Sequence, residues 1–181
     1  EAEHLEGPAK LVTMVQDIME PVAKMDGDSL PVSAFVAHAD GTFEQGASAY
    51  EKRGVAVMVP EWDETKCIQC NRCSYVCPHA TIRPFALTEE EVAAAPEGLQ
   101  VAKMTGKGLE ALKFTMAVSP MDCMGCGVCV GECPAKEKAI KMVPRESQEY
   151  KQPVFDYLVA NVGKKEGMPA KETVKGSQFE K

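Results

Sequence analysis

The chain has 181 residues, a formal net charge of −7 and 45% hydrophobic residues, and only 6% of its residues are aromatic. A length of this order allows one or two small domains with a thin core. The acidic balance argues against nucleic acid as a partner, and no apolar run approaches the ~18 residues of a membrane span. Because a signal-peptide pattern is also missing, we expect a cytoplasmic protein without membrane attachment.

Residues 1–50 are predicted to form an N-terminal linker or wrapping segment with one helix. Between residues 8 and 25 the side chains of Leu11, Val15, Ile18 and Met19 recur at helical spacing. Between residues 26 and 46 the pairs Asp26-Gly27 and Asp40-Gly41 indicate turns. We expect this second stretch to be extended, with four apolar anchors: Leu30, Val32, Phe35 and Val36.

Residues 51–150 are predicted to contain an internal duplication, in which each half reads strand, cysteine loop, turn, strand. The four strand candidates are residues 55–59, 81–84, 113–119 and 139–143. Pro60 and Pro120 end the first strand of each half, just before its cysteines. The fold class is therefore α+β. We expect a bacterial two-cluster ferredoxin-like duplication of short antiparallel strands, cluster loops and short helices, with extended flanking segments.

Residues 85–112 are an insertion between the two halves. The run Thr88-Glu-Glu-Glu91 spells a capping box, which predicts a short helix that ends near Pro96. Residues 105–108 lack the earlier glycine of a phosphate-binding loop, so we interpret them as a turn. Residues 151–181 are predicted to be a C-terminal linker or tail. The chain starts at Glu1 without methionine, which is typical of a piece of a longer polypeptide.

Eight cysteines form two runs with the same spacing, and each run ends in Cys-Pro. They are Cys67, Cys70, Cys73 and Cys77 in the first run, and Cys123, Cys126, Cys129 and Cys133 in the second. The spacing resembles the run that binds [4Fe–4S] clusters in bacterial two-cluster ferredoxins, where the fourth cysteine ligates the other cluster. Cluster I is therefore assigned to Cys67, Cys70, Cys73 and Cys133. Cluster II is assigned to Cys123, Cys126, Cys129 and Cys77.

Zinc and disulfide bonds are the alternative uses of these cysteines. Structural zinc takes pairs of ligands a dozen or more residues apart and needs no third cysteine at the same short step. Eight cysteines can also pair as disulfides. Their density and regular spacing favour clusters, and analysis of iron and acid-labile sulfide separates the three possibilities.

The two cysteine loops differ at matching positions, where Gln69 and Asn71 of the first loop correspond to Gly125 and Gly127 of the second. Glycine lets the backbone approach a cluster and direct its N–H groups at sulfur. Hydrogen bonds to sulfur and solvent exposure tune the reduction potential. We therefore predict unequal potentials for the two clusters, without an assignment of which is higher.

The sequence around these motifs resembles the ferredoxin-type domain of single-chain pyruvate:ferredoxin (flavodoxin) oxidoreductase. The similarity covers about residues 10–160 and includes residues 53–62, 67–84 and 119–123. That family oxidises pyruvate with coenzyme A on thiamine diphosphate and passes electrons singly through [4Fe–4S] clusters. The resemblance implies that this chain is a two-cluster relay between the thiamine-proximal cluster and an external ferredoxin or flavodoxin.

The resemblance also implies which activities and partners lie elsewhere. Thiamine diphosphate and coenzyme A belong only to the parent enzyme, so this chain alone is not expected to oxidise pyruvate, and it offers no catalytic residue. Its partners would be the remainder of the parent oxidoreductase and the external ferredoxin or flavodoxin. Lys136, Lys138 and Lys141 either steer an acidic partner or form a solvated face.

Two other functions compete with this interpretation. The first is a stand-alone ferredoxin, or the ferredoxin-type subunit of another redox complex. The second is a structural metal module with no redox role. The long flanks at residues 1–50 and 145–181 exceed what a bare ferredoxin needs, which favours the fragment of a larger oxidoreductase.

Overall fold

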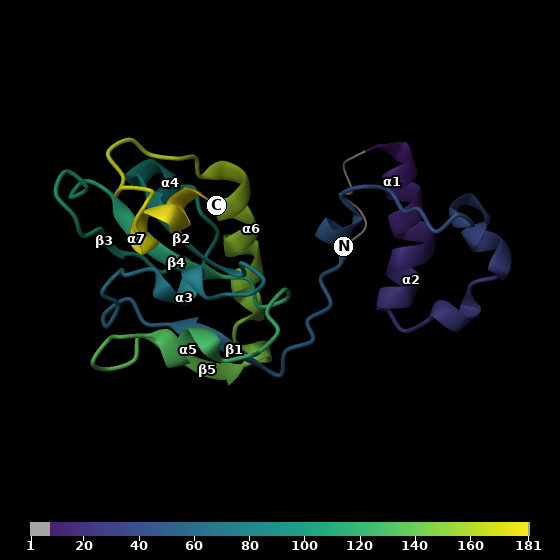
Figure 1. Cartoon of the computed structure of the whole chain (residues 1–181), viewed down its shortest axis with the longest axis horizontal. Helices are drawn as coiled ribbons and strands as arrows, with labels where there is room; N and C mark the ends of the chain where they lie inside the picture. Colours follow the sequence, from purple (N-terminus) through teal and green to yellow (C-terminus); the bar gives the residue numbers. More distant parts are fainter. Residues whose placement is uncertain (1–7, 181) are drawn as a thin grey trace. The chain divides into compact units, whose positions relative to one another are not determined.

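The computed structural model describes residues 8–180, and the chain divides into two units, Glu1–Arg53 and Gly54–Lys181. In the first unit one helical segment runs through α1 (Ala9–Met14), the π-helical η2 (Val15–Met19) and α2 (Glu20–Ala23) (Figure 1). Its buried side chains are Leu11, Met14, Val15 and Ile18. The helix predicted between residues 8 and 25 is therefore confirmed.

The predicted extended course of residues 26–46 is wrong. The chain instead forms two 3₁₀ helices, η3 (Gly27–Ser29) and η4 (Val32–His38), and a third, η5 (Ala47–Tyr50), follows. The supposed anchors Val32 and Val36 are 88% and 70% exposed. Local hydrogen bonds explain the difference, since short 3₁₀ turns satisfy the backbone within the segment.

The second unit contains two antiparallel sheets, which confirms the α+β class with short antiparallel strands. β1 (Met58–Trp62) pairs with β5 (Ile140–Pro144). The other sheet has the order β2-β4-β3, with strands β2 (Ile82–Leu87), β4 (Lys113–Val118) and β3 (Ala102–Lys103). In each sheet a strand next to the first cysteine run thus pairs with a strand next to the second.

Two strands run through prolines: the sequence predicts that Pro60 ends the first strand, and the second predicted strand, residues 81–84, stops at Pro84 itself. β1 begins at Met58 rather than residue 55 and continues through Pro60, which lies opposite Met142. β2 extends past Pro84, which lies opposite Met116. Both are edge strands, which have a pairing partner on one side only. A proline is tolerated there because its nitrogen, which lacks a hydrogen, can face the unpaired side.

Short helices fill the rest of the second unit. α3 (Arg72–Tyr75) and α5 (Val128–Glu132) carry the third cysteine of each run, Cys73 and Cys129, and lie against each other. α4 (Glu89–Ala93) begins with the predicted capping box: the Glu91 N–H donates to Thr88 Oγ1 at 3.2 Å and the Thr88 N–H to Glu91 Oε2 at 2.8 Å. The C-terminal elements are η6 (Arg145–Ser147), η7 (Glu149–Lys151), α6 (Gln152–Asn161), α7 (Val174–Ser177) and η8 (Gln178–Glu180).

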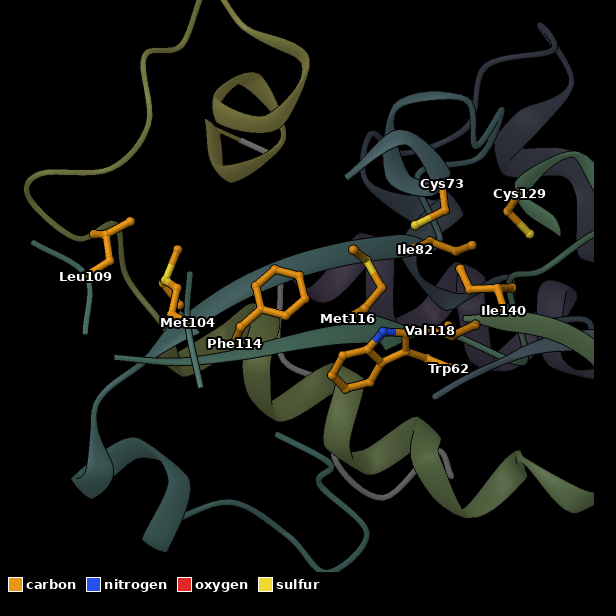
Figure 2. Close-up of a cluster of buried hydrophobic side chains, with 11 residues drawn as sticks. Trp62, Cys73, Ile82, Met104, Leu109, Phe114, Met116, Val118, Cys129 and Ile140 are labelled. Atoms are coloured by element: carbon orange, nitrogen blue, oxygen red, sulfur yellow. The ribbon is translucent and has the colours of Figure 1, made fainter. Parts of the chain in front are cut away.

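The three-stranded sheet has a core on each face, because successive side chains of a strand point in opposite directions. On one face Ala117 and Leu87 pack against Val154, Phe155 and Leu158 of α6. On the other face Phe114, Met116 and Val118 join Trp62, Ile82 and Ile140 in the main core. Figure 2 shows that Cys73 and Cys129 lie at one end of this core, beside Ile82 and Ile140. The core therefore supports the cysteine loops directly.

Among residues 8–180, every helix falls short of the length and apolarity that a membrane crossing requires.

Candidate metal centres

The cysteines gather around two pockets in the second unit. The first pocket is lined by Cys67, Cys70, Cys73 and Cys133, together with apolar residues that include Met116, Ala139 and Ile140. The second is lined by Cys77, Cys123, Cys126 and Cys129, together with Pro60, Ile82, Met124 and Met142. Each pocket thus takes three cysteines from one run and the last cysteine of the other run.

The charges of the thiols follow the same grouping. Cys67 interacts electrostatically with Cys70 and Cys133, and Cys123 interacts with Cys77 and Cys126. Among residues 8–180, no three His, Cys, Asp or Glu side chains converge on a site for a single metal ion. The lining of each pocket includes four thiols, which is the ligand number of a [4Fe–4S] cluster.

Burial raises the pKa of several of these thiols. It raises the pKa of Cys129 to about 11, and it also raises the pKa of Cys67, Cys73 and Cys123. A buried thiolate without a nearby positive charge is disfavoured, and a bound metal removes that penalty because it deprotonates a coordinating thiol. The donor set of both pockets therefore fits an iron–sulfur cluster.

Cys77 behaves differently from the other buried thiols. Burial would raise its pKa, but hydrogen bonds from the Thr81 hydroxyl and from the N–H groups of His79, Thr81 and Ile82 outweigh burial and lower the pKa. Its Sγ lies 3.3 Å from Thr81 Oγ1. The hydrogen bonds of the loop after the first run therefore favour the thiolate form of Cys77 in the second pocket.

Both cysteine loops direct a backbone N–H at a thiol. The N–H of Gln69 donates to Cys67 Sγ, and the N–H of Gly125 donates to Cys123 Sγ, each at 3.4 Å. The loops need left-handed backbone at four matching positions: φ is 55° at Gln69, 60° at Asn71, 70° at Gly125 and 73° at Gly127. The correspondence that the sequence indicated therefore extends to the backbone.

Side-chain hydrogen bonds hold the two non-glycine residues in place. Gln69 Nε2 donates to the Lys103 carbonyl at 2.8 Å, and Gln69 Oε1 accepts from the Thr105 N–H at 2.9 Å. Asn71 Nδ2 donates to the Lys175 carbonyl at 2.9 Å. Both side chains are buried. The insertion and the C-terminal segment thus complete the first loop.

Trp62 brings a buried donor to the first pocket. Its side chain is 4% exposed, and its indole N–H has no partner of ordinary hydrogen-bond geometry among residues 8–180. Burial raises the pKa of Cys67, and interaction with the Trp62 N–H lowers it in part. A buried donor without a partner is costly, so this N–H fits an anionic sulfur acceptor beside Cys67.

Other residues near the cysteine runs take varied positions. His79 lines the second pocket. Lys138 Nζ donates to the Cys133 carbonyl at 2.7 Å, Lys141 pairs with Glu61 at 2.8 Å, and Lys136 is exposed. The supporting roles of Lys175 and Gln178, both in the polar C-terminal segment, were missed, because no pattern marks that segment as part of the site.

Comparison with known proteins identifies the cysteine-containing part. Residues 66–137 match the family described as a 4Fe–4S dicluster domain, and residues 1–56 match EKR, a domain of unknown function. Residues 66–137 therefore form a 4Fe–4S dicluster domain.

The relatives show the larger proteins to which such a chain is similar. The chain is 48% identical over 181 residues, 98% of its length, to pyruvate-flavodoxin oxidoreductase of Enterobacter agglomerans, of which it covers 15%. It is 45% identical over 171 residues, 91% of its length, to pyruvate:ferredoxin oxidoreductase of Moorella thermoacetica, of which it covers 14%. The chain is thus similar to one segment of the pyruvate:ferredoxin and pyruvate-flavodoxin oxidoreductases and spans about one seventh of the length of these relatives.

Proposed function

We propose that this chain relays single electrons through two [4Fe–4S] clusters inside a pyruvate:ferredoxin (flavodoxin) oxidoreductase. The electrons would come from the thiamine-proximal cluster and leave to an external ferredoxin or flavodoxin. The observation that carries the proposal is the pair of four-cysteine pockets, each completed by the last cysteine of the other run. A bound [4Fe–4S] cluster supplies reversible one-electron chemistry.

The proposed ligands follow the linings of the pockets. Cluster I would be held by Cys67, Cys70, Cys73 and Cys133. Cluster II would be held by Cys77, Cys123, Cys126 and Cys129. The interactions of Cys67, Cys123 and Cys129 with other thiols fall within these two groups, whereas Cys73 also interacts with Cys129 of the other group.

The protein's own residues bring the two pockets together on either side of a buried core. Cys73 and Cys129 belong to one buried core (Figure 2), and the thiol of Cys73 interacts with that of Cys129 across the two groups. Ile82 lines the second pocket and Ile140 the first, and both are 3% exposed or less. This arrangement supports electron transfer between neighbouring centres through a dry core.

The duplication and the division of the chain are part of the same proposal. Strands of the first half pair with strands of the second, and the two cysteine loops have matching backbone conformations. Both observations support two related halves within residues 51–150, interrupted by the insertion at residues 85–112. Residues 1–50 and 151–181 would flank them. Thiamine diphosphate and coenzyme A would bind to other parts of the parent enzyme, which we place in the reducing cytoplasm.

A matched pair of variants tests the ligand assignment. Anaerobically prepared protein should contain about eight iron and eight sulfide per chain, and zinc in their place would refute the clusters. Cys77→Ala should remove cluster II from the EPR spectrum of the reduced protein and leave cluster I, whereas Cys133→Ala should do the reverse. If each variant instead lost the cluster of its own run, the crossed ligation would be wrong.

The relay itself is tested in the full-length parent enzyme. Cys77→Ala there should abolish pyruvate-dependent reduction of ferredoxin or flavodoxin, because the path is broken. Reduction of the cluster outside this segment by pyruvate should persist, because the thiamine chemistry lies elsewhere. Undiminished reduction of ferredoxin and flavodoxin without cluster II would refute the proposed path.

A further inference from the structure

The C-terminal strap, residues 173–180, packs on the first cysteine loop. α7 of the strap lies against α3, and η8 lies against β2 (Figure 1). Asn71 Nδ2 donates to the Lys175 carbonyl at 2.9 Å, and Ser74 Oγ donates to Gln178 Oε1 at 2.8 Å. Asn71, Ser74 and Gln178 are all at least 95% buried. The strap is therefore a fixed part of the first pocket's surroundings.

The backbone of the strap turns so tightly at Gly176 that no side chain fits at this position. A Cβ at this position would lie 2.1 Å from the Ala170 carbonyl oxygen and 2.4 Å from that of Pro169. Thr173 Oγ1 accepts the Gly176 N–H at 3.0 Å. Close packing around Gly176, the next residue, thus fixes the position of the Lys175 backbone.

The ammonium group of Lys175 is held next to the loop that carries Cys67. Its Nζ donates to the Thr105 carbonyl at 3.1 Å and to Thr105 Oγ1 at 3.3 Å. Thr105 in turn donates its N–H to Gln69 Oε1, and the Gln69 N–H donates to Cys67 Sγ. Hydrogen bonds made by Thr105 and Gln69 therefore link the ammonium, residue by residue, to the loop of the first thiol of the pocket.

Electrostatics agree with this geometry. Burial lowers the pKa of Lys175, and attraction by the thiolates of Cys67 and Cys70 opposes that change. The positive charge therefore acts on two of the four thiols of the first pocket. In the second pocket Cys126 is exposed and the neighbouring Met124 and Val128 are 53% and 45% exposed.

We infer that Lys175 is a positioning residue that raises the reduction potential of cluster I and so draws the shared electron towards it. Reduction adds a negative charge to an already anionic cluster with thiolate ligands, and a fixed cation nearby favours the reduced form. The inference rests on the proposed function, because it needs a cluster in the first pocket. It deepens that function by assigning part of the difference between the two potentials to a named residue.

The test is a potentiometric titration of the full chain, monitored by EPR, with Lys175→Met as the main variant. We expect a threefold to tenfold shift of the one-electron equilibrium of cluster I towards the oxidised form, which corresponds to roughly 30 to 59 mV. Cluster II should shift less. Lys175→Gln, which keeps a donor for Thr105 but not the charge, should give the same result and serves if the methionine variant folds poorly.

Two control variants separate charge from structure. Lys175→Arg keeps the charge and should leave the potential close to that of the unmodified protein. Lys171→Met removes an exposed charge from the segment just before the strap and should also leave it unchanged. Unshifted potentials in the Met and Gln variants, or an equal shift in the Arg variant, would overturn the inference while the iron content still supports two clusters. A protein without clusters would overturn the proposed function first, and iron analysis would reveal this before any titration.

Discussion

Gln69 and Gly125 hold the same left-handed backbone conformation, with φ of 55° and 70°, and each donates its N–H at 3.4 Å to the cysteine two residues earlier. Gly125 reaches this conformation at little steric cost because it lacks a Cβ. Gln69 is held there by its own buried amide, which bonds to Lys103 and Thr105. The two loops thus reach one geometry by different means, and different substitutions should break them.

Gly125→Ala should destabilise the second loop. The added Cβ would meet the Met58 carbonyl oxygen at 3.0 Å, and φ of 70° is strained for alanine, so we expect a loss of about 1–3 kcal/mol. Urea unfolding and the EPR signal of cluster II measure the effect. Gly131→Ala is the control, because it lies in α5 with nothing within 4 Å of its Cβ. Equal stability of the two variants would show that the close approach at Gly125 is unimportant.

Trp62→Phe should lower the potential of cluster I. Burial raises the pKa of Cys67, and the indole N–H, which is buried without an ordinary partner, opposes that change, so the N–H should favour the more negative, reduced cluster. Phenylalanine keeps an aromatic ring beside Phe114, whose centroid lies 5.9 Å away, but removes the donor. A shift of roughly 30 mV, or threefold in the equilibrium, is expected in an EPR-monitored titration. An unchanged potential would mean that the N–H does not act on the cluster's sulfur.

The sequence predicted the elements that depend on local patterns. The capping box at Thr88 and Glu91 formed both of its hydrogen bonds, because a cap is decided by neighbouring residues. The strand at residues 113–119 appeared as Lys113–Val118, because its alternating side chains face two cores. The pairing of each cysteine pocket with the other run stays a prediction from spacing, and the linings of the pockets agree with it.

What the sequence did not reveal depends on contacts between distant residues. Asn71 meets Lys175 and Ser74 meets Gln178 across 104 positions, and a polar segment carries no periodicity that would announce such contacts. The course of β1 through Pro60 was missed for a similar reason. A proline ends a strand only where its missing N–H would face a partner, and that depends on the position of the strand in the sheet.

Glu91→Gln should destabilise the second unit by about 1 kcal/mol at neutral pH. Lys165 Nζ lies 2.6 Å from Glu91 Oε1, and both side chains are about one fifth exposed or less. Glutamine can still close the capping box at Thr88 with its amide oxygen, so the variant removes the charge of the carboxylate and its hydrogen bond from Lys165. Urea unfolding at pH 7 measures the loss, with Glu90→Gln on the exposed side of α4 as the control. Equal effects of the two substitutions would show that the pair with Lys165 contributes nothing.

The pH dependence of the same pair has a defined sign. Burial would raise the pKa of Glu91, but the hydrogen bonds with Lys165 and the Thr88 backbone outweigh it and lower the pKa below 4.5. A carboxyl with a lowered pKa stabilises the folded state above its unfolded pKa and loses that contribution as the pH falls through the folded value. The difference between the unmodified protein and Glu91→Gln should therefore be full at pH 7 and shrink below about pH 4.5. A difference that stayed constant across this range would exclude the carboxylate as its source.

Removal of iron should unfold the cysteine-containing part of the second unit. The thiols of Cys73 and Cys129 are buried in its main core. Without a cluster, the four thiols of each pocket lose the centre around which they pack. Hydrogen exchange of the anaerobic protein before and after chelation should therefore show lost protection in β1, β2, β4 and β5. The helical segment of the first unit has its own apolar contacts among Leu11, Met14, Val15 and Ile18, so any protection there should not change. Strands that kept their protection without iron would show that the hydrophobic core alone maintains the fold, and that the clusters contribute only their redox chemistry.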